Sequence, residues 1–422
     1  MREMKDSGIA WIGAIPQDWG IVKFKYLHRG LNTGEAIDKE YWETDDAPTV
    51  FYTAGLTPIK TSYSSFPIWK ETGENDLLLA RNGTPYVYLP VSNAYYTDHI
   101  IRAAMSGRIN RKFVYYCLQQ SIASVTVDSV SIPTWSATLW NNQILPCPST
   151  SEQERITTFL DAECAEIDAV LEKTRASIEE YKKLKQAVIT QAVTKGVRGD
   201  RPMKDSGIEW IGDIPAEWSV VRQKYFWNTV ESGVSVNAAD KPVDNSEQYG
   251  VLKTSAVSKF VFIPTEHKQV NLEEYGRVSC PVRADSIVAS RMNTPELVGA
   301  CGYVQNNYPN LFLPDRLWQI TFKDELSPKY AWYYLSGIRV RQYISSLSTG
   351  TSSSMQNISQ SQYGNIFITI PGFEEQSEIT KYLDEKCNSV DALIAKKQQY
   401  LTEIENYKKS LIYEYVTGKR EV

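Results

Sequence analysis

The chain contains the same unusual segment twice, nearly 200 residues apart. Residues 4–26 read MKDSGIAWIGAIPQDWGIVKFKY, and residues 203–225 read MKDSGIEWIGDIPAEWSVVRQKY. Of the 23 aligned positions 15 are identical, and the segment uses many residue types, so neither chance nor low complexity explains the match. Internal repetition of this kind constrains the fold strongly, because each copy is expected to form one structural unit.

A second pair of similar segments follows further along the chain. Residues 151–170 read SEQERITTFLDAECAEIDAV and residues 374–393 read EEQSEITKYLDEKCNSVDAL, with nine identical positions. The order is therefore an opening motif, a variable segment and a charged segment, and then the same three again. The variable segments resemble each other only weakly. This arrangement indicates a fixed frame that carries two different globular domains.

The charged segments have the pattern of long helices. Ser151 and Glu154 have the spacing of a capping box at a helix start, and Lys195-Gly196 supplies a basic last turn and a glycine stop. Between them, apolar or long side chains recur in alternating steps of four and three, which predicts a coiled-coil seam. The seam residues are Ile167, Leu171, Thr174, Ile178, Tyr181, Lys185, Val188 and Ala192, and in the second copy Val390, Ile394, Lys397, Leu401, Ile404, Lys408, Leu411 and Tyr415. At 1.5 Å per residue each helix would be roughly 65 Å long.

We expect the two helices to pack antiparallel about a pseudo-twofold axis. In the alternative, each helix binds another protein and never contacts its sibling, and each seam then needs separate burial. The predicted fold class is α+β, with two globular α/β domains separated by two long antiparallel coiled-coil helices. The predicted boundaries are 1–150 for the first domain, 151–200 for the central helix, 201–373 for the second domain and 374–422 for the C-terminal helix. The tryptophans of the opening motif are expected to anchor each domain onto the helices.

The variable segments read as mixed helix and strand. Residues 74–81 and 284–291 each predict a turn, a buried strand and then an arginine, in a loop closed by Thr-Pro. Residues 111–118 and 328–335 predict short aromatic helices. A polar tract at 348–359 takes the place of residues 128–137 in the first copy, and it is interpreted either as groove lining or as a solvated loop.

Composition limits the class of protein. No stretch reaches the ~18 consecutive apolar residues of a membrane span, and the N-terminus lacks the apolar core of a signal peptide. The cysteines are scattered without a C-x-x-C pair, which favours reduced thiols in a cytoplasm. The net charge is −5, so any surface for nucleic acid must be a local patch.

The motifs of familiar enzymes are missing from the sequence. There is no Asn/Asp-Pro-Pro-aromatic loop of the kind that holds a flipped base, and no G-x-x-x-x-G-K-[ST] phosphate loop. The three histidines, His28, His99 and His267, lack metal-ligand spacing and are interpreted as structural or exposed. We therefore predict a non-catalytic chain without a metal site.

The repeated motifs resemble those of one known family. The D-S-G-x-x-W-I-G-x-I-P-x-x-W signature, the acidic run that opens each long helix and the Val-Thr ending are similar to the specificity subunit of Type I restriction–modification systems (HsdS), over essentially the whole chain. The resemblance implies two target-recognition domains, each binding half of a split, asymmetric DNA sequence. It also implies two methyltransferase (modification) subunits and motor-nuclease subunits as partners, which hold S-adenosylmethionine, ATP and magnesium. A prokaryotic cytoplasm follows as the expected location.

A stiff spacer suits this function, because half-sites on one face of a duplex repeat every ~34–36 Å. The expected DNA contacts are polar and basic loop residues of the variable segments. Arg81 and Arg291 are the leading base readers, since arginine pairs with guanine and asparagine with adenine; in the alternative, each arginine only salt-bridges a neighbour at a hairpin tip. Beside them are Asn82, Thr84, Asn293 and Thr294, and Arg316 is a further candidate. The predicted phosphate clamps are Arg108, Arg111, Lys112 and Lys329, and the predicted groove lining is Thr134, Trp135, Thr349, Thr351, Ser353 and Gln356.

Two other functions remain open from the sequence alone. The first is a coiled-coil protein-binding scaffold without DNA recognition, which the near-neutral variable segments permit. The second is an enzyme with an unfamiliar active site.

Overall fold

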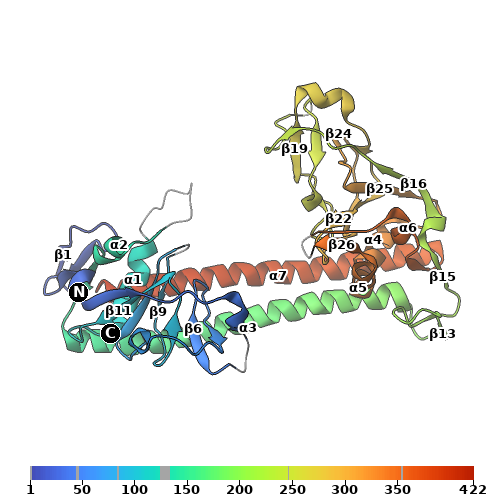
Figure 1. Cartoon of the computed structure of the whole chain (residues 1–422). Coiled ribbons are helices and arrows are strands. Elements are labelled where there is room, and N and C mark those ends of the chain that lie inside the picture. The colour runs from blue at the N-terminus through green and yellow to red at the C-terminus, as the bar shows by residue number, and fades with distance from the viewer. Residues whose placement is uncertain (1, 44–46, 83–84, 124–133, 246, 353–354) are drawn as a thin grey trace. The chain divides into compact units, whose positions relative to one another are not determined.

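The chain forms two compact units (Figure 1). The structure is a computed structural model that describes residues 2–43, 47–82, 85–123, 134–245, 247–352 and 355–422. The first unit comprises residues 1–175 and 398–422, and the second comprises residues 176–397. Each unit therefore contains one globular domain together with a segment of each long helix, so the long helices are shared between the units.

The first unit is built on a four-stranded antiparallel sheet in the order β4-β11-β8-β9. Its strands are β4 (His28–Thr33), β11 (Ile100–Met105), β8 (Asp76–Ala80) and β9 (Val87–Tyr88). The other pairings are β10 (Tyr95–Tyr96), β6 (Thr49–Tyr52), β7 (Ile59–Thr61) and β5 (Trp42–Glu43) in one sheet, β12 (Ile144–Cys147) with β3 (Gly20–Lys23), and β1 (Met4–Asp6) with β2 (Ala14–Pro16). Helices α1 (Arg111–Ala123) and α2 (Ala137–Asn141) complete the domain.

The second unit repeats this plan with additions. Its central sheet has the order β16-β25-β21-β23, with β16 (Trp227–Ser232), β25 (Leu317–Phe322), β21 (Ser286–Ser290) and β23 (Cys301–Val304). A second sheet contains β17 (Ala238–Ala239), β19 (His267–Val270), β18 (Gly250–Leu252), β24 (Tyr308–Phe312) and β20 (Pro281–Val282). The smaller sheets are β22 (Met292–Asn293), β27 (Met355–Asn357) and β26 (Thr349–Ser352); β15 (Ser219–Arg222) with β28 (Phe367–Ile370); and β13 (Met203–Asp205) with β14 (Asp213–Pro215). Its short helices are α4 (Pro328–Ser336), α5 (Ile338–Leu347) and α6 (Gln360–Gly364).

The variable segments therefore share a topology that their sequences barely reveal. The central sheets have the same strand order, with β4, β11, β8 and β9 corresponding to β16, β25, β21 and β23. Both β8 and β21 are five residues long and buried throughout, as their apolar runs predict. The aromatic helices are also present as predicted, as α1 in the first unit and α4 in the second.

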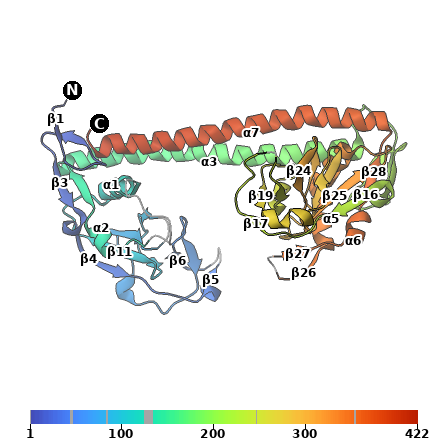
Figure 2. The same cartoon turned by 90° about the horizontal axis from the view of Figure 1, so that it is seen from above.

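The long helices pack antiparallel within each unit, where Figures 1 and 2 show their segments side by side. They are α3 (Thr150–Lys195) and α7 (Phe373–Val416). In the first unit Asp168 forms an ion pair with Lys408 at 2.7 Å, and in the second Asp391 pairs with Lys185 at 2.6 Å. These two pairs are copies of one another, because both of their members are offset by 223 residues.

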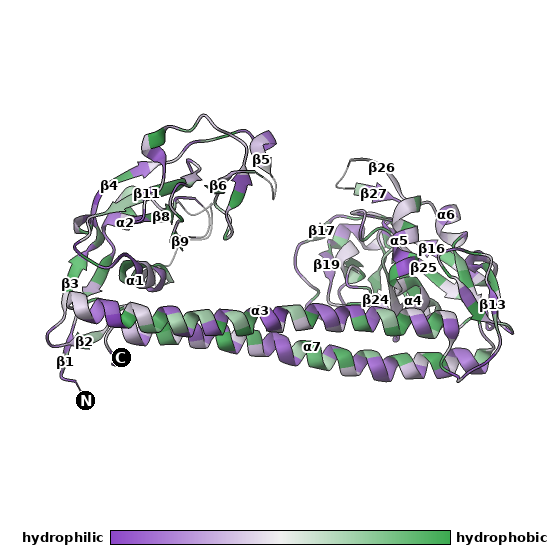
Figure 3. Cartoon of the chain, turned by 90° about the horizontal axis from the view of Figure 1, so that it is seen from below, coloured by the Kyte–Doolittle hydropathy of each residue, from purple (hydrophilic) through white to green (hydrophobic). Residues whose placement is uncertain are grey.

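All the predicted seam positions are sheltered from solvent. Leu171, Ile178 and Leu411 are at most 5 % exposed, while Ile167, Val188, Val390, Ile394 and Leu401 are half-buried. Figure 3 shows apolar and polar residues interleaved along both helices, as expected for rods that bury one stripe and expose the rest.

The start of α3 differs from the prediction. The cap is Ser149, whose Oγ accepts a hydrogen bond of 3.3 Å from the backbone N of Glu152, so Ser151 lies inside the first turn. The helix ends as predicted at Lys195, and Gly196 adopts a positive φ of 76°, which glycine tolerates without steric cost.

The opening motif anchors each domain at an end of the long helices. Trp19 and Trp218 are each 1 % exposed. Their indole Nε1 atoms donate hydrogen bonds of 2.9 Å to Glu152 at the start of α3 and to Glu375 at the start of α7. The repeated tryptophan therefore serves the packing of the frame, as predicted.

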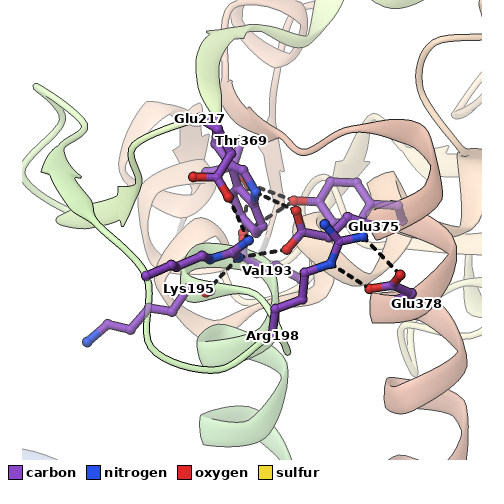
Figure 4. A network of polar contacts seen from close by, with 10 residues as sticks. Val193, Lys195, Arg198, Glu217, Thr369, Glu375 and Glu378 are labelled. Atoms are coloured by element: carbon purple, nitrogen blue, oxygen red, sulfur yellow. Dashed lines mark hydrogen bonds and ion pairs between the residues drawn. The ribbon is translucent and has the colours of Figure 1, made fainter.

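In each copy an arginine forms an ion pair with the glutamate that accepts the tryptophan hydrogen bond. Arg2 forms an ion pair with Glu152, and in the second unit Arg201 forms an ion pair of 2.7 Å with Glu375. Figure 4 shows the second network, in which Glu217, Lys195 and Glu375 lie close together. Arg201 also bonds Glu217 and the backbone O of Lys195, so one guanidinium joins the end of α3 to the start of α7.

Candidate nucleic-acid interface

In the first unit, the candidate interface lies where β8 ends. Arg81 follows this strand, and its backbone N donates a hydrogen bond of 2.8 Å to the backbone O of His99. The backbone O of Arg81 accepts a hydrogen bond of 2.6 Å from the backbone N of Trp135, and Asn82 forms a β-bridge with Thr134. Three distant segments thus meet at one edge of the central sheet. Arg81, His99 and Thr134 are exposed there.

The second unit has the same arrangement at the end of β21. The backbone N of Arg291 donates a hydrogen bond of 2.9 Å to the backbone O of Arg316, and its O accepts 3.1 Å from the N of Ile358. Asn293 is paired in register with Gln356 between β22 and β27. Arg291 and Arg316 are both exposed. The structure therefore brings together most of the residues that were predicted separately in this domain.

The predicted arginines at these edges are not neutralised by acids. Arg81, Arg291 and Arg316 make no ion pair with a carboxylate among the residues that the structure describes. Arg108 follows the opposite end of β11, away from this edge, and it likewise makes no such pair within the described residues. The alternative prediction for Arg81 and Arg291, a salt bridge to a neighbouring acid, therefore finds no support in the described part of the chain. Exposed guanidinium groups of this kind can bind phosphate or base edges.

The polar tract of the second unit contains two paired antiparallel strands. Thr349 and Thr351 lie in β26 and Gln356 lies in β27, which pairs with β22 beside Asn293. Of the two interpretations of this tract, the plain loop is replaced by paired strands, whereas the groove lining stays a prediction. Thr294 follows β22, and its backbone N bonds the side chain of Asn293. Thr84 and Ser353 lie outside the described residues.

The prediction that Trp135 contacts DNA is wrong. Its side chain is only 2 % exposed and packs on Trp140 with a centroid separation of 4.8 Å. The corresponding residue of the second unit, Ile358, is fully buried. Each of these apolar residues precedes a serine that caps a short helix, and that shared position is the signal that identifies Trp135 as core.

Two predicted phosphate clamps instead tie a domain to a long helix. Lys112 forms an ion pair with Asp161, and Lys329 with Asp384. Each carboxylate also accepts a hydrogen bond of 2.8 Å from a tyrosine hydroxyl of the same short helix, Tyr116 or Tyr333. These matched contacts correct the prediction, because both cations are already paired with carboxylates in an equivalent structural role.

Arg111 is a further correction. Its Nη1 donates to the backbone O of Asp76 at 3.1 Å, and burial lowers the pKa of its guanidinium. A half-buried guanidinium bound to a strand carbonyl is not placed to clamp phosphate. Arg108, by contrast, is exposed, so its assignment as a phosphate clamp stays a prediction.

Type I specificity proteins are similar to this chain in sequence. Residues 216–406 match the family described as Type I restriction modification DNA specificity domain. The specificity subunit of the Type I restriction enzyme MjaVIII from Methanocaldococcus jannaschii is 24 % identical over 433 aligned residues, covering 97 % of this chain and 94 % of that protein. The EcoEI specificity subunit from Escherichia coli is 23 % identical over 187 residues, covering 44 % of this chain and 32 % of that protein.

The chain is thus similar to Type I specificity subunits over nearly its whole length, and the family model matches its second half. A chain from a solved structure concerning complex assembly and conformational transition of the type I R-M system is similar in fold, with a TM-score of 0.64 and 16 % identity. The match covers 96 % of this chain and 99 % of that chain. The predicted α+β fold with long helices is confirmed.

One residue of the candidate interface was missed from the sequence. Nδ1 of His99 lies 2.8 Å from the side-chain nitrogen of Asn82, so an exposed histidine orients a predicted base reader. The sequence did offer a signal. His99 directly precedes an apolar run, and Arg316 occupies the same place before the corresponding run of the second copy. The other two histidines are structural: His28 bonds Asn141, and His267 bonds the backbone at Pro264 and Val243.

Within the described residues of the chain, no three His, Cys, Asp or Glu side chains are grouped so that they could hold a metal ion. None of the described helices is both long and apolar enough to cross a membrane.

Proposed function

We propose that this chain recognises a bipartite, asymmetric DNA sequence, with one half-site for each globular domain, as the specificity subunit of a Type I restriction–modification complex. The observation that carries the proposal is the repeated sheet edge. The same position after a buried strand holds an exposed arginine in both units, Arg81 and Arg291, whereas the polar residues around it differ. Two unlike readers on one repeated frame suit a site whose two halves differ.

The frame also supports a scaffolding function. Each domain is tied to the long helices by the same contacts, including Trp19 with Glu152 and Trp218 with Glu375. A partner that binds one copy of this frame finds an equivalent surface on the other. We propose two methyltransferase subunits as such partners, with motor-nuclease subunits joining that core.

We further propose that the chain is not itself an enzyme. The S-adenosylmethionine, ATP and magnesium that methylation, translocation and cleavage require are assigned to the partner subunits. The absence from the sequence of known methyltransferase and phosphate-loop motifs supports this assignment. The complex would act in the cytoplasm of a prokaryote. Purified chain incubated alone with DNA and labelled methyl donor should show no turnover.

A segment exchange tests the modular function. Residues 20–150 are replaced by the corresponding segment of a relative, and methylated positions are mapped across the genome of a host that expresses the complete complex. We expect only one half of the recognised sequence to change. Altered specificity in both halves would refute the assignment of one half-site to each domain.

A salt series separates DNA recognition from a scaffold that binds only protein. Phosphate contacts make log K fall linearly with log salt concentration, and each lost contact reduces the slope by ~0.9. We expect binding of the intact chain to a duplex to show such a slope and Arg108→Ala to reduce it. Lys112→Ala is the matched control, since Lys112 is paired with Asp161 and its loss should leave the slope unchanged. A chain that binds no DNA at low salt would favour the scaffold.

A further inference from the structure

We infer that one equivalent residue in each unit determines which base the domain reads. It is His99, directly before β11, in the first unit, and Arg316, directly before β25, in the second. The inference rests on the proposed function and extends it to the chemistry of each half-site. In this scheme the first unit presents a polar edge that matches adenine, and the second presents paired donors that match guanine.

The two positions are structurally equivalent. In the first unit the backbone N of Arg81 bonds the O of His99 at 2.8 Å, and in the second the N of Arg291 bonds the O of Arg316 at 2.9 Å. The strands beyond them share a register, with Ala80 opposite Ile100 in the first unit. Ser290 is correspondingly opposite Leu317 in the second. The repeat therefore places one arginine and one variable residue side by side at the same sheet edge in each unit.

In the first unit the variable residue positions an amide. The side-chain nitrogen of Asn82 is a donor, so Nδ1 of His99 accepts the 2.8 Å hydrogen bond and the proton of the neutral imidazole lies on Nε2. The Oδ1 atom of Asn82 and its second N–H make no hydrogen bond within the described residues. One acceptor beside one donor is the pattern that pairs with N6 and N7 of adenine.

In the second unit both elements of that pair are replaced. Met292 stands where the first unit has Asn82, and Arg316 stands where it has His99. Arg291 and Arg316 are exposed neighbours without a carboxylate partner among the described residues. Guanidinium groups offer only donors, and the matching base edge is O6 with N7 of guanine.

The test exchanges the two edges in the full-length chain. One variant carries Asn82→Met with His99→Arg, and the reciprocal variant carries Met292→Asn with Arg316→His. Each chain is used to select duplexes from a library randomised over both half-sites. The first variant should change one position of its half-site from adenine to guanine, and the reciprocal variant should make the opposite change in the other half-site. Each variant should leave the other domain's half-site as in the parent.

A second pair of variants isolates the positioning role of His99. His99→Gln keeps an acceptor for Asn82 and should retain the adenine preference, whereas His99→Ala frees the amide and should lower discrimination roughly tenfold. A merely structural role would move thermal unfolding in both variants and leave base preference unchanged. This pair also decides the question if an exchange variant does not fold.

The outcomes separate this inference from the proposed function. If the parent chain selects a bipartite sequence and the variants select the same sequence, the inference is overturned while the proposed function stands. An unchanged preference in His99→Ala, or a first half-site without adenine at the affected position, also overturns it. If the parent chain selects no sequence at all, the proposed function itself fails.

Discussion

Removing the guanidinium of Arg201 should lower the local stability of the second unit around β13 and β14. Its side chain is 11 % exposed and pairs with Glu375 at 2.7 Å, whose side chain is only 4 % exposed. Arg201→Met preserves much of the apolar stem but leaves the Glu375 carboxylate buried with the Trp218 indole as its remaining described hydrogen-bond donor. Breaking a buried pair from one side costs about 3–5 kcal/mol, because the remaining charge is uncompensated.

Hydrogen exchange followed by mass spectrometry measures this loss where it occurs. A cost of that size corresponds to an increase of roughly 100-fold to 4,000-fold in the local opening equilibrium constant, since every 1.4 kcal/mol is tenfold. We expect faster exchange in β13 and β14, which span Met203–Pro215. The equivalent strands of the first unit, β1 and β2, provide the internal reference, because Arg2 and Glu152 form their own pair.

Two further variants make this prediction refutable. Arg198→Met removes an ion pair with Glu378 in which both side chains are 48 % exposed, so it should leave protection of β13 and β14 unchanged. The double variant Arg201→Met with Glu375→Gln removes the stranded charge and should recover part of the lost protection. If the loss of protection in the double variant instead equals the sum of the losses in Arg201→Met and Glu375→Gln alone, the two residues are not coupled and the reasoning is wrong.

Three other predictions concern packing, charge and pH. Trp135→Ala should lower the free energy of unfolding by about 3–5 kcal/mol, as for other buried aromatic residues, whereas Thr134→Ala beside it should have little effect in the same denaturant titration. Reversing Asp168 to Lys should cost about 0.2–1 kcal/mol, and adding Lys408→Asp should restore it; a double-mutant cycle without coupling would contradict the pairing. Burial raises the pKa of Tyr88 to about 12, above its ordinary value of 10.0, so the stability it contributes is present below pH 10 and lost as pH rises toward 12. Tyr88→Phe should flatten that alkaline decline in thermal unfolding, and an unchanged decline would exclude Tyr88 as its source.

The frame of the molecule could be predicted from sequence because its signals are local and repeated. The 4–3 pattern from Ile167 to Ala192 indicates a helix with one buried stripe, since side chains at those steps share a face. Gly196 marks the helix end through its freedom to adopt a positive φ. The buried runs before Arg81 and Arg291 likewise predict strands, which the structure places in equivalent sheets. The second copy strengthens each such prediction, because two diverged segments follow one pattern.

Local patterns alone could not assign individual residues to the interface. The residues around Trp135 predict a loop. In the structure Trp135 is buried, because its backbone N bonds the backbone O of Arg81, 54 residues earlier, at the end of the central sheet. Lys112 reads as a free cation, yet Asp161 on a distant helix neutralises it. His99 reads as an isolated histidine, yet it holds the amide of Asn82. Exposure and pairing depend on groups far apart in the chain, and only tertiary packing brings such groups together.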